Sequence, residues 1–547
     1  MIWSLLPVIS TNQVILSTQN TPNHDEKAAH LARSAGSVSI AVFFSRILGL
    51  VREQVLAGLF GAGTAMDAFV VAFRIPNLLR DLFAEGALSA AFVTVFTEYD
   101  QKRSKEETWR LVNNVLAVLT VVVSLTVILG MIFSNELVML LAPDFAKIAG
   151  KVELTQRLTI IMFPFLLLVS LSSVLMGILN TKGYFFIPSL ASSCFNMTSI
   201  VVGVGLALLF PLWGQPAIMG MAIGTLLGGL SQMGIQVPVI LRQGFRIKPV
   251  MDLADPGLKR IARLIVPAII GLSATQINIF INTNFASRCA EGSVAWLNYA
   301  FRLVQFPIGL FGVAISIATL PVVARLATKG DHKVLGNTLV SSLTLAFALT
   351  IPAAVGLWVL AEPIVGLIFE HGRFTQSDTF MTAQALRFYS MGLLAYAAVK
   401  IVVPVFYALN DTRWPVIGSF LAVAVNICII LATLDKLQHR AIALSTSVTM
   451  ILNFMLLATV LYRKIDGYPA GKLFMSLGKI FLASGIMGLL VWWVQIRIAG
   501  SPGIWLSTVK VFAPMSLGIV SYGILAYVLK LTEFTEIINK VIKRIRD

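Results

Sequence analysis

Charged residues occur inside a stretch of the chain that is otherwise apolar enough to cross a membrane. The segment SRILGLVREQVLAG, residues 45–58, contains Arg46, Arg52 and Glu53. Inserting one arginine or aspartate at the centre of a membrane helix costs about 2.5–3.5 kcal/mol on translocon scales. These side chains must therefore face protein or water instead of lipid, and intramembrane charges of this kind indicate a functional site.

Further charges lie in or beside other apolar segments. An internal ion-pair network would explain the acids, with Arg80 or Asp81 pairing with Glu85 and Arg52 pairing with a neighbouring acid. The arginines nevertheless outnumber the nearby acids, and a cationic cleft is what an anionic substrate requires. Arginine suits phosphate because its planar guanidinium donates two hydrogen bonds at once. These further charges are Asp67, Arg74, Arg80, Asp81, Glu85, Arg302, Arg387 and Lys400.

Glycine and proline interrupt the same segments. Arg46 and Arg52 are about 120° apart on a straight helix, and Gly49 lies between them. A bend there would bring both guanidinium groups to one cavity. Pro76 and Pro307 interrupt two segments that correspond to each other in an internal repeat, and matching broken helices point to a transporter binding site. We predict hinges at all three residues, although a single proline also fits a simple packing kink.

The amino-acid composition indicates that these segments lie in a membrane. Of the 547 residues, 57% are hydrophobic and only 12% are charged, against about 25% in a soluble domain. A spanning helix needs about 20 mostly apolar residues, and alternating barrel strands are absent from the sequence. We predict an all-α integral membrane protein with fourteen transmembrane helices. The runs are 37–58, 66–97, 111–133, 154–179, 187–210, 217–240, 262–285, 294–324, 338–369, 380–408, 415–434, 441–462, 473–495 and 505–529.

The net charge of +16 is distributed in alternate loops. Lysine and arginine concentrate in the loops on one side of the membrane, which predicts that both termini are cytoplasmic. The basic residues then face membrane lipid headgroups, and nucleic acid is excluded as a partner. The three cysteines and five histidines have no metal-ligand spacing, so we expect no metal and no cofactor. The loops are short and carry no catalytic motif, which favours a transporter over an enzyme.

An internal repeat organises the chain. At an offset near 228, AFRIPN (72–77) matches AFRLVQFP (300–307), and at 230, LNTKGYFFIP (179–188) matches LNDTRWPVIG (409–418). Six spans in each repeat predict two pseudo-symmetric six-helix lobes around a central cavity, an alternating-access plan. We expect the two lobes at 37–240 and 241–464 and two further helices at 465–530. Residues 1–36 are expected to form a disordered cytoplasmic extension, and 531–547 a basic cytoplasmic tail.

The quoted segments resemble a known family. SRILGLVRE, followed by GAGTAMDAFVVAFRIPNLLRDLFAEGALSAAFVTVFTEY, is similar to the start of the MurJ (MviN) family of lipid II flippases, in the multidrug/oligosaccharidyl-lipid/polysaccharide exporter superfamily. The similarity continues through FEHGRFT and VFYALNDTRWPV and covers essentially 37–530. The resemblance implies fourteen spans in two lobes and a groove for the lipid tail along the last two spans. It also implies that Arg46, Arg52, Asp67, Arg80 and Arg302 are cavity residues that the family needs.

The sequence departs from the family at several of these positions. Asp81 follows Arg80 where a second basic residue is often found, and Phe301 and Gln305 flank Arg302 where some members carry acids. The seventh span contains Asn278, Asn282 and Asn284 but no carboxylate, so a sodium site based on an acid is not supported. We assign substrate binding to Arg46, Arg52, Arg80 and Arg302, and gating or structural ion pairs to Asp67, Glu53, Glu85 and Asp81.

The expected function is lipid II flipping in the bacterial inner membrane. The substrate would be undecaprenyl-pyrophosphoryl-MurNAc-pentapeptide-GlcNAc, moved from the inner to the outer leaflet for peptidoglycan synthesis. A flippase for another polyprenyl-linked oligosaccharide needs the same charges and stays open. A cation-coupled multidrug exporter of the same fold would need an aromatic and acidic cavity, which the arginine excess argues against. A polyprenyl-lipid glycosyltransferase would need an essential carboxylate in an outer loop.

Overall fold

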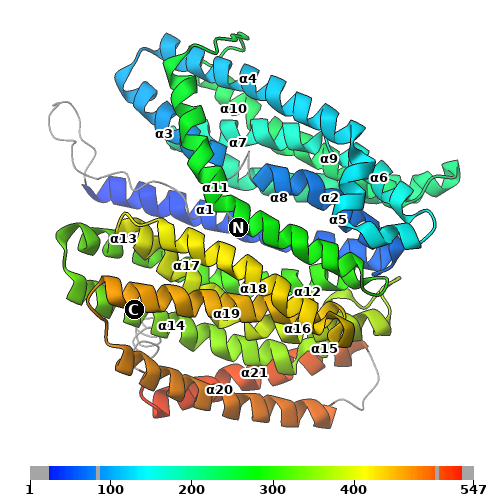
Figure 1. Ribbon diagram of the computed structural model, residues 1–547, viewed down its shortest axis with the longest axis vertical. Helices are drawn as coiled ribbons and strands as arrows, with labels where there is room; N and C mark the ends of the chain where they lie inside the picture. Colours follow the sequence, from blue (N-terminus) through cyan, green and yellow to red (C-terminus); the bar gives the residue numbers. More distant parts are fainter. Residues whose placement is uncertain (1–23, 82–86, 499–503, 532–547) are drawn as a thin grey trace. The chain divides into compact units, whose positions relative to one another are not determined.

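A computed structural model describes residues 24–81, 87–498 and 504–531, with side chains from residue 40 in the first range and from 508 in the last. Over these residues helices are the only regular secondary structure, and there is no strand (Figure 1). The first half contains α1 His24–Phe60, α2 Thr64–Arg80, α3 Ala87–Lys102, α4 Lys105–Ile132, α5 Ser134–Leu141, η2 Pro143–Lys147, α6 Lys151–Met162, α7 Phe165–Thr181, α8 Phe186–Leu209, η3 Phe210–Trp213, α9 Ile218–Gly234 and α10 Val237–Arg242. The second half contains α11 Pro256–Ser287, α12 Ser293–Pro307, η4 Ile308–Val313, α13 Ala314–Lys329, α14 His332–Val359, α15 Ala361–Phe369, α16 Gln376–Met391, α17 Leu393–Ala408, α18 Arg413–Leu437, α19 His439–Lys464, α20 Ala470–Ile498 and α21 Ile504–Val528.

The described chain contains 11 helices that are long and apolar enough to cross a membrane, or 12 if the bent pair α16 and α17 forms one span. They correspond to the predicted runs from 111–133 onward. The first two predicted runs are not among them. The run 37–58 lies within α1, and the described part of the run 66–97 is divided between α2, which has only 17 residues, and α3. The multi-span helical class is confirmed, and the number fourteen stays a prediction.

The first helix is longer than expected. It starts at His24, so residues 24–36 of the expected extension are helical, whereas residues 1–23 lie outside the described residues. The predicted tail 531–547 lies outside them too, apart from Leu531. The predicted run 338–369 is divided at Leu360 into α14 and α15.

The chain divides into two compact units. We call 24–56, 63–81 and 87–276 the N-terminal unit, and 57–62, 277–498 and 504–531 the C-terminal unit. The division falls within α11, later than the predicted lobe boundary between 240 and 241, and within the last turn of α1. Both helices therefore contribute residues to the two units, and α20 and α21 belong to the C-terminal unit.

The order of the helices repeats with the offset that the sequence indicated. Adding 228 to the bounds of α2 gives 292–308, where α12 spans Ser293–Pro307. The same addition gives 362–369 for α5, where α15 spans Ala361–Phe369. For α8 it gives 414–437, where α18 spans Arg413–Leu437. The two halves thus place equivalent helices at equivalent positions in the chain.

Each unit has its own apolar core. In the N-terminal unit, α3, α4 and α7 pack around Phe92 and Phe96, whose ring centroids are 5.4 Å apart. In the C-terminal unit, α14, α17, α19 and α20 form the core, and α21 packs on α20 (Figure 1). Tyr522 of α21 donates its hydroxyl to the carbonyl of Ala348 at 2.7 Å, which fastens this last helix to α14.

Candidate functional site

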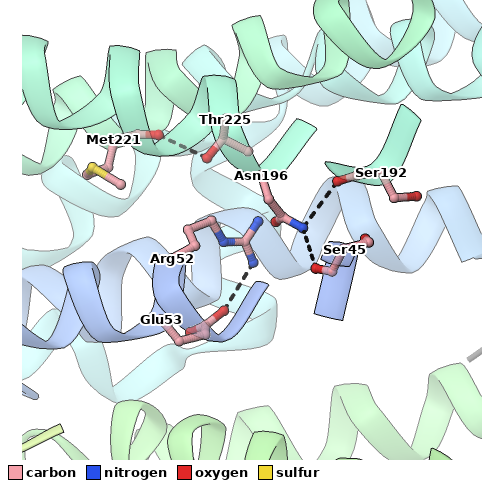
Figure 2. A network of polar contacts seen from close by, with 7 residues as sticks. All are labelled: Ser45, Arg52, Glu53, Ser192, Asn196, Met221 and Thr225. Carbon is pink, nitrogen blue, oxygen red and sulfur yellow. Dashed lines mark hydrogen bonds and ion pairs between the residues drawn. The ribbon is translucent and has the colours of Figure 1, made fainter. Parts of the chain in front are cut away.

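Arg52 and Glu53 form an ion pair on α1 (Figure 2). The Nη2 of Arg52 lies 3.0 Å from Oε1 of Glu53, and the side chains are only 11% and 5% exposed. The guanidinium also lies over the ring of Phe195 on α8, 5.3 Å from its centroid. One residue further, Asn196 donates Nδ2 to the carbonyl of Ser45 at 3.3 Å. The expected pairing of Arg52 with a neighbouring acid is therefore present, and the arginine is held between α1 and α8.

Arg80 and Asp81 form a second pair at the end of α2. The Nη2 and Nε of Arg80 donate to Oδ1 of Asp81 at 2.9 and 3.2 Å, and Nε2 of Gln276 donates to Oδ2 of Asp81 at 3.4 Å. The side chains of the pair are about one-fifth exposed. Glu85, the other acid expected here, lies outside the described residues. Asp81 thus lies against the arginine that precedes it.

Arg46 and Arg302 are both exposed on the unit that carries them. Arg46 lies on α1 among the exposed apolar side chains of Phe43, Phe44 and Ile47. Arg302 lies on α12 in the C-terminal unit, whereas Arg46, Arg52 and Arg80 belong to the N-terminal unit. Arg52 and Arg80 are therefore each paired with the acid that follows them in the sequence, and Arg46 and Arg302 are exposed residues.

Asp67 has a partner that the sequence did not reveal. Its Oδ2 lies 2.9 Å from Nζ of Lys151, and both side chains are only 2% exposed. Asp67 was expected in an ion pair, but its partner was not predicted. The two are separated by 84 positions, so no local pattern joins them. The two residues meet because α2 packs against α6 in the folded chain.

The three expected hinges differ in their surroundings. The helix α1 continues without a break through Gly49, where an added Cβ would meet Asn196 Nδ2 at an ordinary 3.7 Å. Pro76 is buried inside α2, which runs on to Arg80. Pro307 is the last residue of α12, and the π-helix η4 follows it directly. The helix of span eight thus changes from α to π directly after Pro307, and π-helical turns of this kind often occur at functional sites. The hinge role of all three residues stays a prediction.

The asparagines of the seventh span form an uncharged network in the C-terminal unit. Asn426 of α18 donates Nδ2 to the side-chain oxygens of Asn278 at 2.9 Å and of Asn282 at 2.7 Å. Asn282 in turn donates to the hydroxyl of Thr446 on α19 at 3.2 Å. These contacts join α11, α18 and α19 through amide and hydroxyl groups, and no carboxylate takes part in the contacts described.

Glycines allow a close contact around the end of α1, all of it within the C-terminal unit. Arg373 donates its backbone N–H to the carbonyl of Gly58 at 2.8 Å. A Cβ on Gly61 would lie 2.5 Å from the carbonyl oxygen of Arg373, and a Cβ on Gly372 would lie 2.2 Å from that of Gly58. Tyr299 donates its hydroxyl to the Gly61 carbonyl at 3.2 Å. This contact explains the segment FEHGRFT, to which the sequence analysis gave no role.

The remaining charges of the tenth span have separate surroundings. Arg387 Nη2 lies 2.8 Å from Oε1 of Glu362 and is partly exposed. Lys400 is partly buried on α17, and its backbone carbonyl accepts a hydrogen bond from the hydroxyl of Ser316 at 2.6 Å. That contact places Lys400 beside the first turn of α13, which follows η4. Of these two cations, only Arg387 has a carboxylate in a described ion pair.

Comparison with known sequences identifies the protein family that carries this set of intramembrane charges. The family described as "Lipid II flippase MurJ" matches residues 56–510. The chain belongs to this family. It is 35% identical over 452 residues to the "Probable lipid II flippase MurJ" of Buchnera aphidicola subsp. Acyrthosiphon pisum, covering 82% of this chain and 88% of that protein. The corresponding protein of Vibrio cholerae is 34% identical over 501 residues, covering 90% and 95%.

Solved structures agree with the family. The structure titled "Lipid II flippase MurJ, inward closed conformation" superposes with a TM-score of 0.75 at 27% identity and covers 90% of this chain and 98% of that one. A multidrug resistance MATE family transporter of the MOP superfamily superposes at 0.63 with 17% identity, covering 77% and 94%, which shows a shared fold alone. The protein is therefore a multi-pass membrane flippase of the lipid II type that serves peptidoglycan synthesis, and it is a transporter, not an enzyme.

Proposed function

We propose that this flippase moves lipid II from the inner to the outer leaflet of the bacterial cytoplasmic membrane by alternating access, with both termini in the cytoplasm. Arg46, Arg52, Arg80 and Arg302 bind the pyrophosphate of the lipid. The observation that carries the proposal is Arg46, a guanidinium exposed among apolar side chains on a helix that belongs to a membrane protein. Such a cation is costly in lipid, and an anionic substrate offsets the cost.

The chemistry of a diphosphate matches the two kinds of arginine. Arg46 and Arg302 are exposed residues, and a guanidinium group can donate two N–H bonds to two phosphate oxygens at once. Arg52 and Arg80 are held by Glu53 and Asp81, and a carboxylate neighbour fixes the direction of the guanidinium before the substrate arrives. Pre-oriented donors lose less entropy when they bind.

The lipid tail requires a different surface. We propose that the polyprenyl chain stays in the bilayer along α20 and α21. Support comes from the large apolar side chains that these helices expose, among them Trp492, Trp493, Ile519 and Tyr527, each more than half exposed. Exposed apolar side chains of this kind are compatible with lipid and costly in water. The headgroup therefore needs a polar path, whereas the tail needs none.

Identifying the accumulated precursor would test the substrate. In a bacterium that depends on this flippase alone, we expect depletion to accumulate lipid II in the inner leaflet and to stop peptidoglycan synthesis. Accumulation of a different polyprenyl-linked oligosaccharide, with lipid II translocated normally, would contradict the proposed substrate. The same measurement excludes or supports a multidrug exporter, because depletion of an exporter leaves both precursors unchanged.

A further inference from the structure

The pair Asp67 and Lys151 is more deeply buried than any other ion pair for which the structure gives side-chain exposures. Each of the other ion pairs described has at least one side chain that is 11% exposed or more, whereas the side chains of Asp67 and Lys151 are both 2% exposed. The ammonium of Lys151 also lies 4.2 Å from the centroid of the Phe145 ring. Removing Asp67 would leave the ammonium of Lys151 buried without this counter-charge, which is strongly unfavourable.

The position of Lys151 is unfavourable without Asp67. Lys151 is the first residue of α6, and the N-terminus of a helix carries a partial positive charge that repels a cation. The N-cap Gly150 provides no side-chain hydrogen bond to this helix start. Asp67, by contrast, lies in the first turn of α2, where the helix dipole favours an acid. Asp67 therefore stabilises Lys151, and the pair joins the starts of α2 and α6.

The second repeat joins the equivalent helices in another way. The offset of 228 carries Asp67 to 295 and Lys151 to 379, and next to these positions Trp296 donates Nε1 to Oδ1 of Asp378 at 2.9 Å. Asp378 also completes the capping box at the start of α16. The acid lies on the second helix of the pair here and on the first helix in the other repeat. Both repeats thus have a polar link at this place, but only the first requires a buried cation.

We propose that Lys151 is a positioning residue for lipid II flipping that acts through Asp67. The ion pair holds the start of α2 against α6, and α2 ends at Arg80, one of the arginines proposed to bind pyrophosphate. On this view Asp67 is required as the counter-charge of Lys151 and makes no contact with the substrate. The inference rests on the proposed flippase function.

Paired substitutions separate this role from a direct role of Asp67. Lys151→Met and Asp67→Asn should each lower the rate of lipid II translocation per molecule of protein in the membrane by at least tenfold. The double variant Asp67→Asn/Lys151→Met removes both charges and should recover most of that rate, because replacing both members of a buried pair is tolerated far better than removing one. Translocation is measured as the lipid II that an added external hydrolase cleaves, divided by the amount of flippase on an immunoblot.

A neighbouring ion pair provides a matched control. Lys147 and Asp144 lie 2.6 Å apart in the same region, but Lys147 is 74% exposed. Lys147→Met should therefore leave the translocation rate unchanged. If Lys151→Met fails to accumulate in the membrane, the charge-reversed variant Asp67→Lys/Lys151→Asp tests the same link.

Two results would overturn the proposal. One is a double or charge-reversed variant that reaches the membrane at the wild-type amount and still does not flip lipid II, since Asp67 would then act beyond its partner. The other is a Lys151→Met variant with an unchanged rate per molecule, since the pair would then serve folding alone. In both cases the flippase activity of the unaltered protein stands, so that failure of this inference is distinguishable from failure of the proposed function.

Discussion

The backbone N–H of Arg373 donates to the carbonyl oxygen of Gly58 at 2.8 Å, so the segment after α15 is hydrogen-bonded to the last turn of α1. Gly372 makes this approach possible. Its φ is +61°, a left-handed conformation, and any Cβ there would meet the Gly58 oxygen at 2.2 Å. The last turn of α1 thereby belongs to the C-terminal unit, although the preceding turns of the helix belong to the N-terminal unit.

Gly372→Ala should destabilise the protein by about 2 kcal/mol or more, because a left-handed alanine costs about 1–2 kcal/mol and the clash with backbone adds to it. Thermal unfolding in detergent measures the loss. Gly330→Ala is the matched control, since Gly330 has a φ of +70° with nothing within 4 Å of an added Cβ. Equal effects of the two substitutions would show that the contact with Gly58 contributes nothing.

Arg46→Glu should abolish lipid II flipping while the protein still inserts in the membrane. The substitution replaces a donor pair for phosphate with a charge that repels it. Complementation of a flippase-depleted strain measures the activity, and membrane fractionation measures insertion. Arg242→Glu, at an exposed arginine in the last turn of α10, should complement normally. Growth supported by Arg46→Glu would contradict the proposed role of this arginine.

Asp81→Asn should strengthen the binding of inorganic pyrophosphate by about threefold to tenfold, because it removes one negative charge beside Arg80 at a partly screened distance. Titration of the purified protein at low and high salt measures the change, which should shrink as salt rises. Asp466→Asn, at a side chain that is 91% exposed, should have no effect. Unchanged affinity in Asp81→Asn would place the pyrophosphate away from Arg80.

Asp411 should make a pH-dependent contribution to stability. Its side chain accepts from Lys464 and from the backbone N–H of Arg413, and these contacts hold the pKa of Asp411 below its ordinary value of 3.8. A lowered pKa in the folded state means that the stabilisation is complete above about pH 4 and is lost as pH falls through the folded-state value.

The variant Asp411→Asn should therefore lose about 0.5–1 kcal/mol at pH 7, the usual value of an accessible ion pair. Below pH 4 its unfolding temperature should approach that of the unaltered protein. Unfolding midpoints between pH 3 and pH 7 compare the two. Curves that stay parallel down to pH 3 would mean that Asp411 does not titrate with a lowered pKa.

Much of the architecture could be predicted from the sequence because the hydrocarbon core of a membrane constrains each spanning segment locally. A segment that crosses a bilayer must be mostly apolar and must form its backbone hydrogen bonds within the helix. Each span can therefore be recognised from about 20 consecutive residues. The runs from 111–133 onward correspond to helices for this reason. The repeat was accessible too, because AFRIPN and AFRLVQFP preserve local sequence at one offset.

The tertiary structure decided which charges meet. The pairs of Arg52 with Glu53 and Arg80 with Asp81 join sequence neighbours, and the sequence already indicated the first of them. The pair of Asp67 with Lys151 joins residues 84 positions apart, and no periodicity or motif connects them. Ion pairing depends on distances of a few ångströms between helices, and only the packing of α2 on α6 sets that distance.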